Sequence, residues 1–168
     1  MFARSLASGQ RIALQLDHDD GTVAASTANG LELAESDVGL LFRLDMRRVR
    51  NASAIHSIVD GNNRACVSVS YAVEQERIET FAGHKVRVIT QASLRELSLV
   101  RRGVAEEAFA FVTDDVSNPS IAQLEDSDMF KICRADHNVR RATRAIQDDT
   151  AQLTARIDRL CERAGLRI

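Results

Sequence analysis

Three short stretches of the sequence contain a serine, a histidine and a glutamate, the side chains from which an activated hydroxyl nucleophile can be built. The first runs from Ala65 to Val73, where large apolar and small residues alternate strictly, as in a β-strand with one buried face. Its apolar face holds Val67, Val69, Tyr71 and Val73, and its other face holds Cys66, Ser68, Ser70 and Ala72. A strand fixes the position of a serine hydroxyl, as a nucleophile requires, although a serine in a strand is more often a half-exposed residue without a catalytic role.

The histidine follows the end of a predicted strand at Arg11–Leu16, in the polar run Asp17-His18-Asp19-Asp20-Gly21. This run is compatible with a solvated turn, with the start of a cation-binding loop, or with a histidine placed for proton transfer. A calcium loop does not fit, because no glutamate follows at the required distance. The sequence contains no second cluster of metal ligands, so we expect no metal site.

The glutamate, Glu96, lies in a predicted strand from Leu94 to Val100. Alternation places it on a mostly apolar face with Leu94, Ser98 and Val100, opposite Leu97 and Leu99. A buried carboxylate is costly unless it is paired. Either this face is in contact with water, or Glu96 has a partner such as a histidine or an arginine.

The pattern before residue 113 predicts further strands and one helix. Asn29-Gly30 separates two short β-like stretches and favours a tight hairpin. The other predicted elements are a strand at 40–46, a helix at 49–60, a polar hairpin of strands 74–80 and 85–90 around Phe81–His84, and a helix or strand at 104–112. We therefore expect a mainly β fold with helices (α+β), in which a compact and mostly antiparallel β-barrel carries one or two packed helices.

Composition limits the class of protein. With 168 residues, 45% of them hydrophobic, the chain can bury the core of one soluble domain, or of one domain with an appendage. A formal net charge of −2 gives no broad attraction for nucleic acid or for an anionic membrane, so we expect neither as a partner. No apolar run approaches the roughly 20 residues that span a bilayer, and three widely spaced cysteines are typical of reduced thiols. These features favour a cytosolic protein.

A change of composition at Asp114–Ser120 marks a boundary. We expect a β-domain at 1–115, a linker at 116–138 and an amphipathic, coiled-coil-like helix at 139–168. Its apolar seam consists of Ala142, Ile146, Thr150, Leu153, Ile157, Leu160 and Ala164. This helix could dock on its own domain, pair with a second copy or hold a scaffold partner, and we expect self-association because an isolated short helix rarely persists unpacked.

Taken together, the three stretches resemble the prohead maturation proteases of tailed bacteriophages, which are distantly related to the herpesvirus capsid-assembly proteases. Leu14–Asp19 resembles the family segment that ends in the catalytic histidine. Val67–Tyr71 is similar to the family strand Leu-Ser-Ile-Gly-Phe, with Ser70 where glycine is common, and Leu94–Val100 is similar to Leu-x-Glu-Val-Ser-Leu-Val. The resemblance covers about residues 2–112, in the family's order of histidine, serine and acid.

The resemblance implies a barrel of the herpesvirus-protease type and a triad of Ser68 as nucleophile, His18 as base and Glu96 as the acid. In the herpesvirus branch an Arg-Arg-Gly stretch supplies oxyanion contacts, which assigns that role to Arg101 and Arg102. Family members usually have one or two strands before the segment near Phe2, so we expect an incomplete barrel.

The implied activity is a serine endopeptidase without cofactor that cleaves phage capsid and scaffold proteins inside the assembling prohead, in the cytoplasm of the bacterial host. Related capsid proteases are often dimeric, which agrees with the expected self-association. The alternative is a catalytically inactive structural or scaffolding module of the same fold. A generic small-molecule-binding barrel would leave His18 and Glu96 without a common role.

Overall fold

The computed structural model describes residues 1–168 except 38, 62, 106, 115–119 and 164–168. By its internal contacts the chain forms two units, Met1–Ser127 and Asp128–Ile168. The expected linker at 116–138 includes residues that lie outside the described part of the chain. The two units are described separately below.

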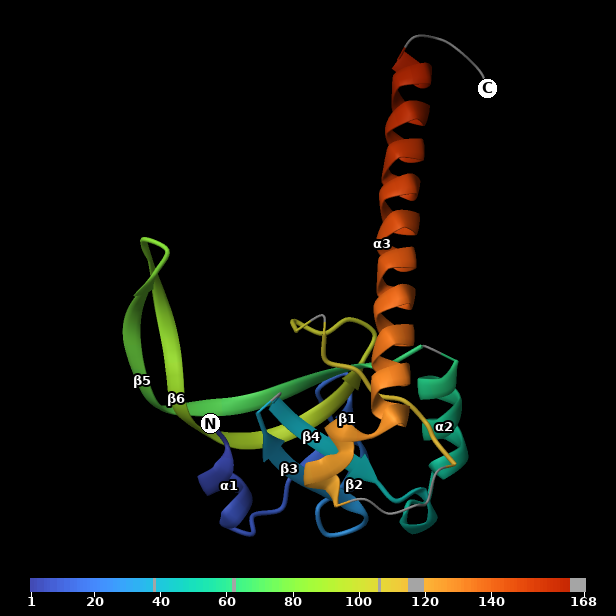
Figure 1. Cartoon of the computed structure of the whole chain (residues 1–168). Coiled ribbons are helices and arrows are strands. Elements are labelled where there is room, and N and C mark those ends of the chain that lie inside the picture. The colour runs from blue at the N-terminus through green and yellow to red at the C-terminus, as the bar shows by residue number, and fades with distance from the viewer. Residues whose placement is uncertain (38, 62, 106, 115–119, 164–168) are drawn as a thin grey trace. The chain divides into compact units, whose positions relative to one another are not determined.

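In the described part of the first unit there are two helices and six strands. Figure 1 shows their arrangement. In chain order these are α1 (Ala3–Ala7), β1 (Ala13–Leu16), β2 (Asp19–Ser26), β3 (Leu31–Ser36), β4 (Gly39–Leu44), α2 (Ala52–Asp60), β5 (Cys66–Phe81) and β6 (His84–Val100). Two short 3-10 helices, Met46–Arg48 and Ile121–Asp126, complete the regular structure. The mixed α+β class expected from the sequence is confirmed.

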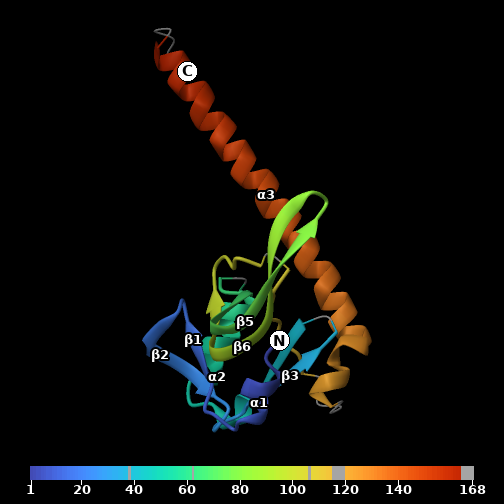
Figure 2. The same cartoon turned by 90° about the vertical axis from the view of Figure 1, so that its left-hand side faces the viewer.

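The strands form two separate sheets. One has four strands in the order β2-β1-β6-β5, and the other consists of β3 and β4. All pairs are antiparallel except β1 and β6, which run parallel (Figure 2). In the part of the chain that the structure describes the sheets do not close on each other, so the expected barrel is not confirmed.

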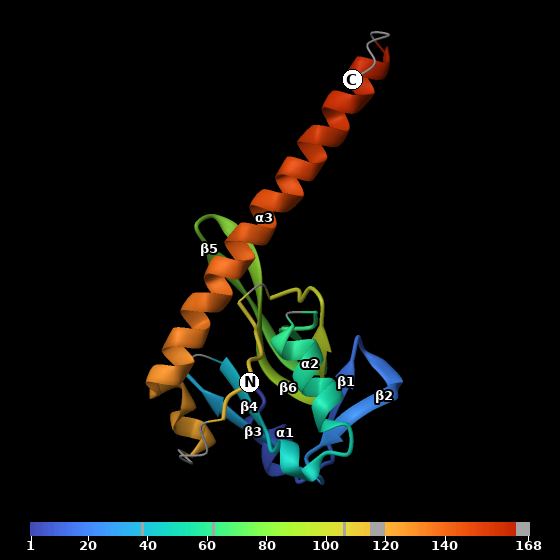
Figure 3. The same cartoon turned by 90° about the vertical axis from the view of Figure 1, so that its right-hand side faces the viewer.

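The face of the larger sheet that carries most of the leucines is buried. Leu14 of β1 and Leu97 and Leu99 of β6 are at most 2% exposed, and the two buried residues of α2, Ile55 and Val59, belong to the same core. In Figure 3, α2 lies in front of β6. This core fixes the direction of alternation in β1 and β6. It therefore also decides which residues are left on the opposite face, and those include Glu96.

The strands β5 and β6 form one long hairpin. Its tip is the turn Ala82-Gly83, where both residues have positive φ, as a two-residue hairpin of this kind requires. The predicted hairpin around Phe81–His84 is confirmed, and its strands are continuous with the predicted strands at 65–73 and 94–100. The outer half extends beyond the rest of the first unit (Figure 1), and Ile78 and Phe81 there are mostly exposed.

A β-bulge interrupts the register of this hairpin next to Glu96. Ser70 pairs with Glu96 and Tyr71 pairs with Leu94, so Arg95 is an extra residue in β6. Leu94 consequently lies in the core with 0% exposure, and the prediction that it shares the face of Glu96 is wrong. Tyr71 pairs with Leu94 and therefore stays on the predicted face with Val69, where its ring contacts Phe2 edge to face, although it is 37% exposed.

Two other predictions need correction. Asn29-Gly30 does not join a hairpin, because β2 and β3 belong to different sheets. Instead the Asn29 side chain accepts hydrogen bonds from the backbone and hydroxyl of Ser26 at the end of β2. The described part of 104–112 is neither a helix nor a regular strand, and it pairs with β5 through a single bridge between Phe109 and Cys66.

The described part of the second unit is one helix, α3 (Asp128–Arg163), of 36 residues. It begins at Asp128 rather than at residue 139. Asp128 lies in its first turn, where a carboxylate interacts favourably with the helix dipole. Three of the predicted seam residues are largely exposed: Ile146 at 67%, Leu153 at 58% and Ile157 at 46%. Among the described residues, no helix combines the length and apolar character needed to cross a membrane.

Candidate active site

His18 lies in a strained hairpin turn. Leu16 of β1 pairs with Asp19 of β2, so the turn consists of Asp17 and His18 alone, with φ of 53° and 60°. Turns of this kind favour Asn-Gly, because a residue with a Cβ loses about 1–2 kcal/mol in the left-handed region. A histidine at the second position is therefore maintained against its backbone preference.

Tertiary contacts hold this turn against β6 and against the segment after α2. The Asp17 backbone N–H donates to the Leu99 carbonyl over 3.1 Å, and the Arg64 Nε donates to the Asp17 carboxylate over 2.8 Å. The hydrogen bond from Arg64 is the main cause that lowers the pKa of Asp17, and the nearby charges of Arg64, Arg101 and His18 act in the same direction. The turn is thus fixed from two sides.

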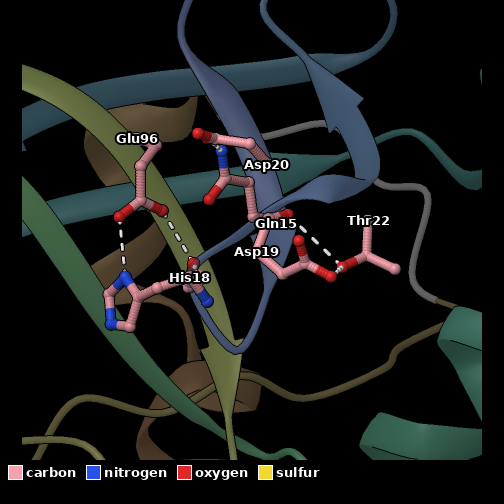
Figure 4. Close-up of polar contacts among 7 residues, drawn as sticks. Gln15, His18, Asp19, Asp20, Thr22 and Glu96 are labelled. Atoms are coloured by element: carbon pink, nitrogen blue, oxygen red, sulfur yellow. Dashed lines mark hydrogen bonds and ion pairs between the residues drawn. The ribbon is translucent and has the colours of Figure 1, made fainter.

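The imidazole of His18 contacts Glu96, as the buried-carboxylate argument requires. Its Nδ1 is 2.7 Å from Glu96 Oε1, and Figure 4 shows the ring directed at that carboxylate. The Glu96 side chain is only 10% exposed, whereas the His18 side chain is 44% exposed. Because an ionised carboxylate can only accept, Nδ1 carries the proton and Nε2 is the nitrogen left to accept one.

Ser98 connects the histidine backbone to the acid. Its hydroxyl donates to Glu96 Oε2 over 2.7 Å and accepts from the backbone N–H of His18 over 3.1 Å. Ser98 has 0% exposure, and its hydrogen bond to Glu96 is buried. Buried groups that are fully satisfied hold one geometry, which is the condition for a preorganised acid–base pair.

Ser68 and Ser70 lie on the neighbouring strand β5, on the same face as this pair. In the antiparallel register Ser68 is opposite Ser98, and Ser70 is opposite Glu96. Opposite residues have Cβ atoms about 4.5–5.5 Å apart. Among the described residues no hydrogen bond joins Ser68 to His18, so the direct contact between nucleophile and base stays a prediction.

A pocket of about 720 Å³ opens on this face of the sheet. Its lining comprises Arg11, Ala13, Gln15, His18, Asp20, Val69, Ser70, Tyr71, Arg95 and Glu96. Ser70 therefore lines the pocket directly, whereas Ser68 is not part of its wall. A substrate in this pocket would contact both the imidazole and the acid.

The segment that follows β6 returns along β5. Arg101 and Arg102 are exposed residues directly after Val100, and Gly103 lies against the Val67 carbonyl. A Cβ on Gly103 would come within 2.8 Å of that oxygen, so only glycine fits here. The candidate oxyanion segment is thus held beside the residue that precedes Ser68.

Comparison with known proteins identifies the family. The family model of the caudovirus prohead serine proteases matches residues 1–122. The chain belongs to this family. No curated protein and no solved structure matches the chain.

Membership of the prohead protease family confirms the resemblance found in the sequence and makes the chain a serine peptidase by family. The matched region contains all six strands, and with them His18, Ser68 and Glu96. The assignment of a triad to these residues is not part of that match, and it depends on the geometry described above.

Sequence analysis of the prohead protease chain missed two residues that shape the site. Ser98 had a signal, because its alternation with Glu96 placed both on one face, but its bonding role was not assigned. Arg64 had none, since its contact with Asp17 joins residues far apart in the chain. Among the residues that the structure describes, no group of three or more His, Cys, Asp or Glu side chains could hold a metal.

Proposed function

We propose that this chain is a serine endopeptidase in which Ser68 is the nucleophile, His18 the general base and Glu96 the acid that orients the imidazole. The observation that carries this proposal is the His18–Glu96 pair, locked by Ser98 on the sheet face that also bears Ser68. Family membership supports the same reaction class.

In the proposed reaction the Ser68 hydroxyl attacks a peptide carbonyl while His18 Nε2 takes its proton. Glu96 stabilises the imidazolium that forms, and the imidazolium then gives the proton to the leaving amine. Water attacks the acyl-enzyme in the second half-reaction, again with His18 as the base. This scheme does not require a hydrogen bond between Ser68 and His18 in the free protein, because hydrogen bonds between nucleophile and base often tighten only when substrate binds.

The oxyanion of the tetrahedral intermediate is assigned to the segment Arg101-Arg102-Gly103. Its backbone N–H groups and a guanidinium would stabilise the developing charge, a role worth on the order of 10² to 10³ in rate. The close approach of Gly103 to Val67 supports this assignment, because it keeps the segment next to the nucleophile strand.

The proposed substrates are the phage capsid and scaffold proteins, cleaved inside the assembling prohead. The description of the family as prohead proteases supports this choice. The competing possibility is an inactive module of the same fold that serves only in assembly.

Labelling with a fluorophosphonate probe tests the nucleophile. Wild-type protein is expected to react, Ser68→Ala to lose both labelling and cleavage of a scaffold or capsid substrate, and Glu96→Gln to retain weak activity. Ser70→Ala is the matched control, because it removes a hydroxyl from the same strand face.

The variants separate the alternatives. If Ser70→Ala silences the protein and Ser68→Ala does not, the nucleophile is Ser70, a result that its position in the pocket wall would explain. If wild-type protein neither reacts with the probe nor cleaves substrate, the assembly role replaces the peptidase.

A further inference from the structure

Two arginines line the pocket beside the candidate acid–base pair. Arg11 lies just before β1 and Arg95 lies within β6, and both are exposed. Within the described part of the chain, neither guanidinium takes part in a hydrogen bond or an ion pair. Unpaired guanidinium groups that share one pocket are available to a ligand.

The carboxylates of the same pocket are engaged elsewhere. Asp20 accepts a hydrogen bond from Gln15 Nε2 over 2.7 Å, and Glu96 is bound by both His18 and Ser98 (Figure 4). Among the described residues, neither carboxylate forms an ion pair with Arg11 or Arg95. A ligand can therefore supply the anion that pairs with the two guanidinium groups.

The β-bulge explains how Arg95 reaches the pocket. In a regular strand Arg95 would point away from Glu96, toward the core that contains Leu97. As the extra residue of the bulge it is instead exposed and lines the pocket, while Leu94 stays buried. Bulges next to active sites re-aim side chains in this way.

We propose that Arg11 and Arg95 form a subsite for an acidic side chain, Asp or Glu, of the peptide substrate. The inference rests on the proposed peptidase function and names its substrate class. A carboxylate fits because the planar guanidinium fork binds it through two parallel hydrogen bonds, a geometry that a neutral amide does not match.

A positional-scanning library of octapeptides tests this subsite. Each peptide carries Glu or Gln at one fixed position and an amidated C-terminus, so that the side chain is its single designed carboxylate. Affinity is measured by fluorescence anisotropy at low salt, and turnover by mass spectrometry. At the preferred position we expect wild-type protein to bind the Glu peptide about tenfold more tightly than the Gln peptide, as two exposed charge pairs allow.

The variants assign this preference to residues. Arg11→Gln and Arg95→Gln should each reduce it by severalfold, the double variant should abolish it, and Arg95→Lys should retain part of it. Arg50→Gln is the matched control, because Arg50 is an exposed arginine outside the pocket, and it should leave the preference unchanged. Thermal unfolding checks that each variant is folded.

Two outcomes would overturn the subsite: equal affinity for Glu and Gln at every position, or a preference that survives in the double variant. Turnover separates the two proposals. Cleavage without any Glu preference overturns the subsite and leaves the peptidase intact. A preference that depends on Arg11 and Arg95 without any cleavage supports the subsite and removes the peptidase.

Discussion

The left-handed conformation of His18 gives a prediction that separates its chemical role from its backbone cost. At a φ of 60°, alanine loses about 1–2 kcal/mol relative to glycine, because only glycine lacks the Cβ that crowds the carbonyl. His18→Gly and His18→Ala both remove the imidazole and its contact with Glu96. The difference between the two variants therefore isolates the strain of the turn.

We expect His18→Gly to be more stable than His18→Ala by about 1 kcal/mol in urea unfolding, with equal m-values, which corresponds to a few degrees in Tm. Neither variant should cleave substrate. Relative to wild type, the glycine variant is stabilised by the relief of backbone strain and destabilised by the loss of a hydrogen bond to a buried carboxylate. The net change in its free energy of unfolding should therefore be small.

Val23 provides the control with the opposite sign. It lies in the extended strand β2 and is 46% exposed, so Val23→Gly should be less stable than Val23→Ala. If the free energy of unfolding of His18→Ala equals or exceeds that of His18→Gly, the reasoning is refuted, and His18 does not hold the left-handed conformation in solution. Confirmation would mean that the turn retains a costly residue for the sake of its side chain.

Three further predictions concern Ser98, Asp17 and Leu153. Ser98→Ala should lower the free energy of unfolding by about 2 kcal/mol, because it removes a buried hydrogen bond to a carboxylate. The same variant should reduce kcat, and Ser98→Thr should restore part of the stability and part of kcat. Arg64 lowers the pKa of Asp17 below 3.8, so this pair contributes fully to stability above that pH, and its contribution is lost as the pH falls through the lowered pKa. Asp17→Asn should therefore make the free energy of unfolding, measured in urea, depend less on pH on the acid side. Leu153 lies in the exposed seam of α3, so sedimentation should show that the wild-type protein self-associates and that Leu153→Asp shifts it toward monomer. A wild-type protein that is strictly monomeric at high concentration would contradict this prediction.

The pairing of Glu96 could be predicted from the sequence because it follows from local physics. Alternation placed the carboxylate on an apolar face, and the cost of burying a charge demanded a partner. The structure supplies that partner as His18. The strands at 65–73 and 94–100 were likewise predictable, since their pattern has a period of two.

Features that depend on tertiary contacts could not be predicted. Asn29-Gly30 has the stronger hairpin composition, yet the two-residue turn forms at Asp17-His18, where contacts from Arg64 and Ser98 outweigh intrinsic preference. The bulge at Arg95 left no compositional signal, because a single extra residue changes the register without changing the residue types. Closure of a barrel is a property of strand pairing, on which alternation carries no information.

The parallel pairing of β1 and β6 links stability to the site. Gln15 is opposite Ser98 and Leu14 is opposite Leu97, so the same register that buries the leucines places the turn after β1 beside Leu99, from where the His18 imidazole contacts Glu96. A slip of one residue would move every side chain of β1 to the other face of the sheet. The core would then be lost together with the contact between His18 and Glu96. The apolar core thus fixes the relative position of the acid and the base, although neither of them is apolar.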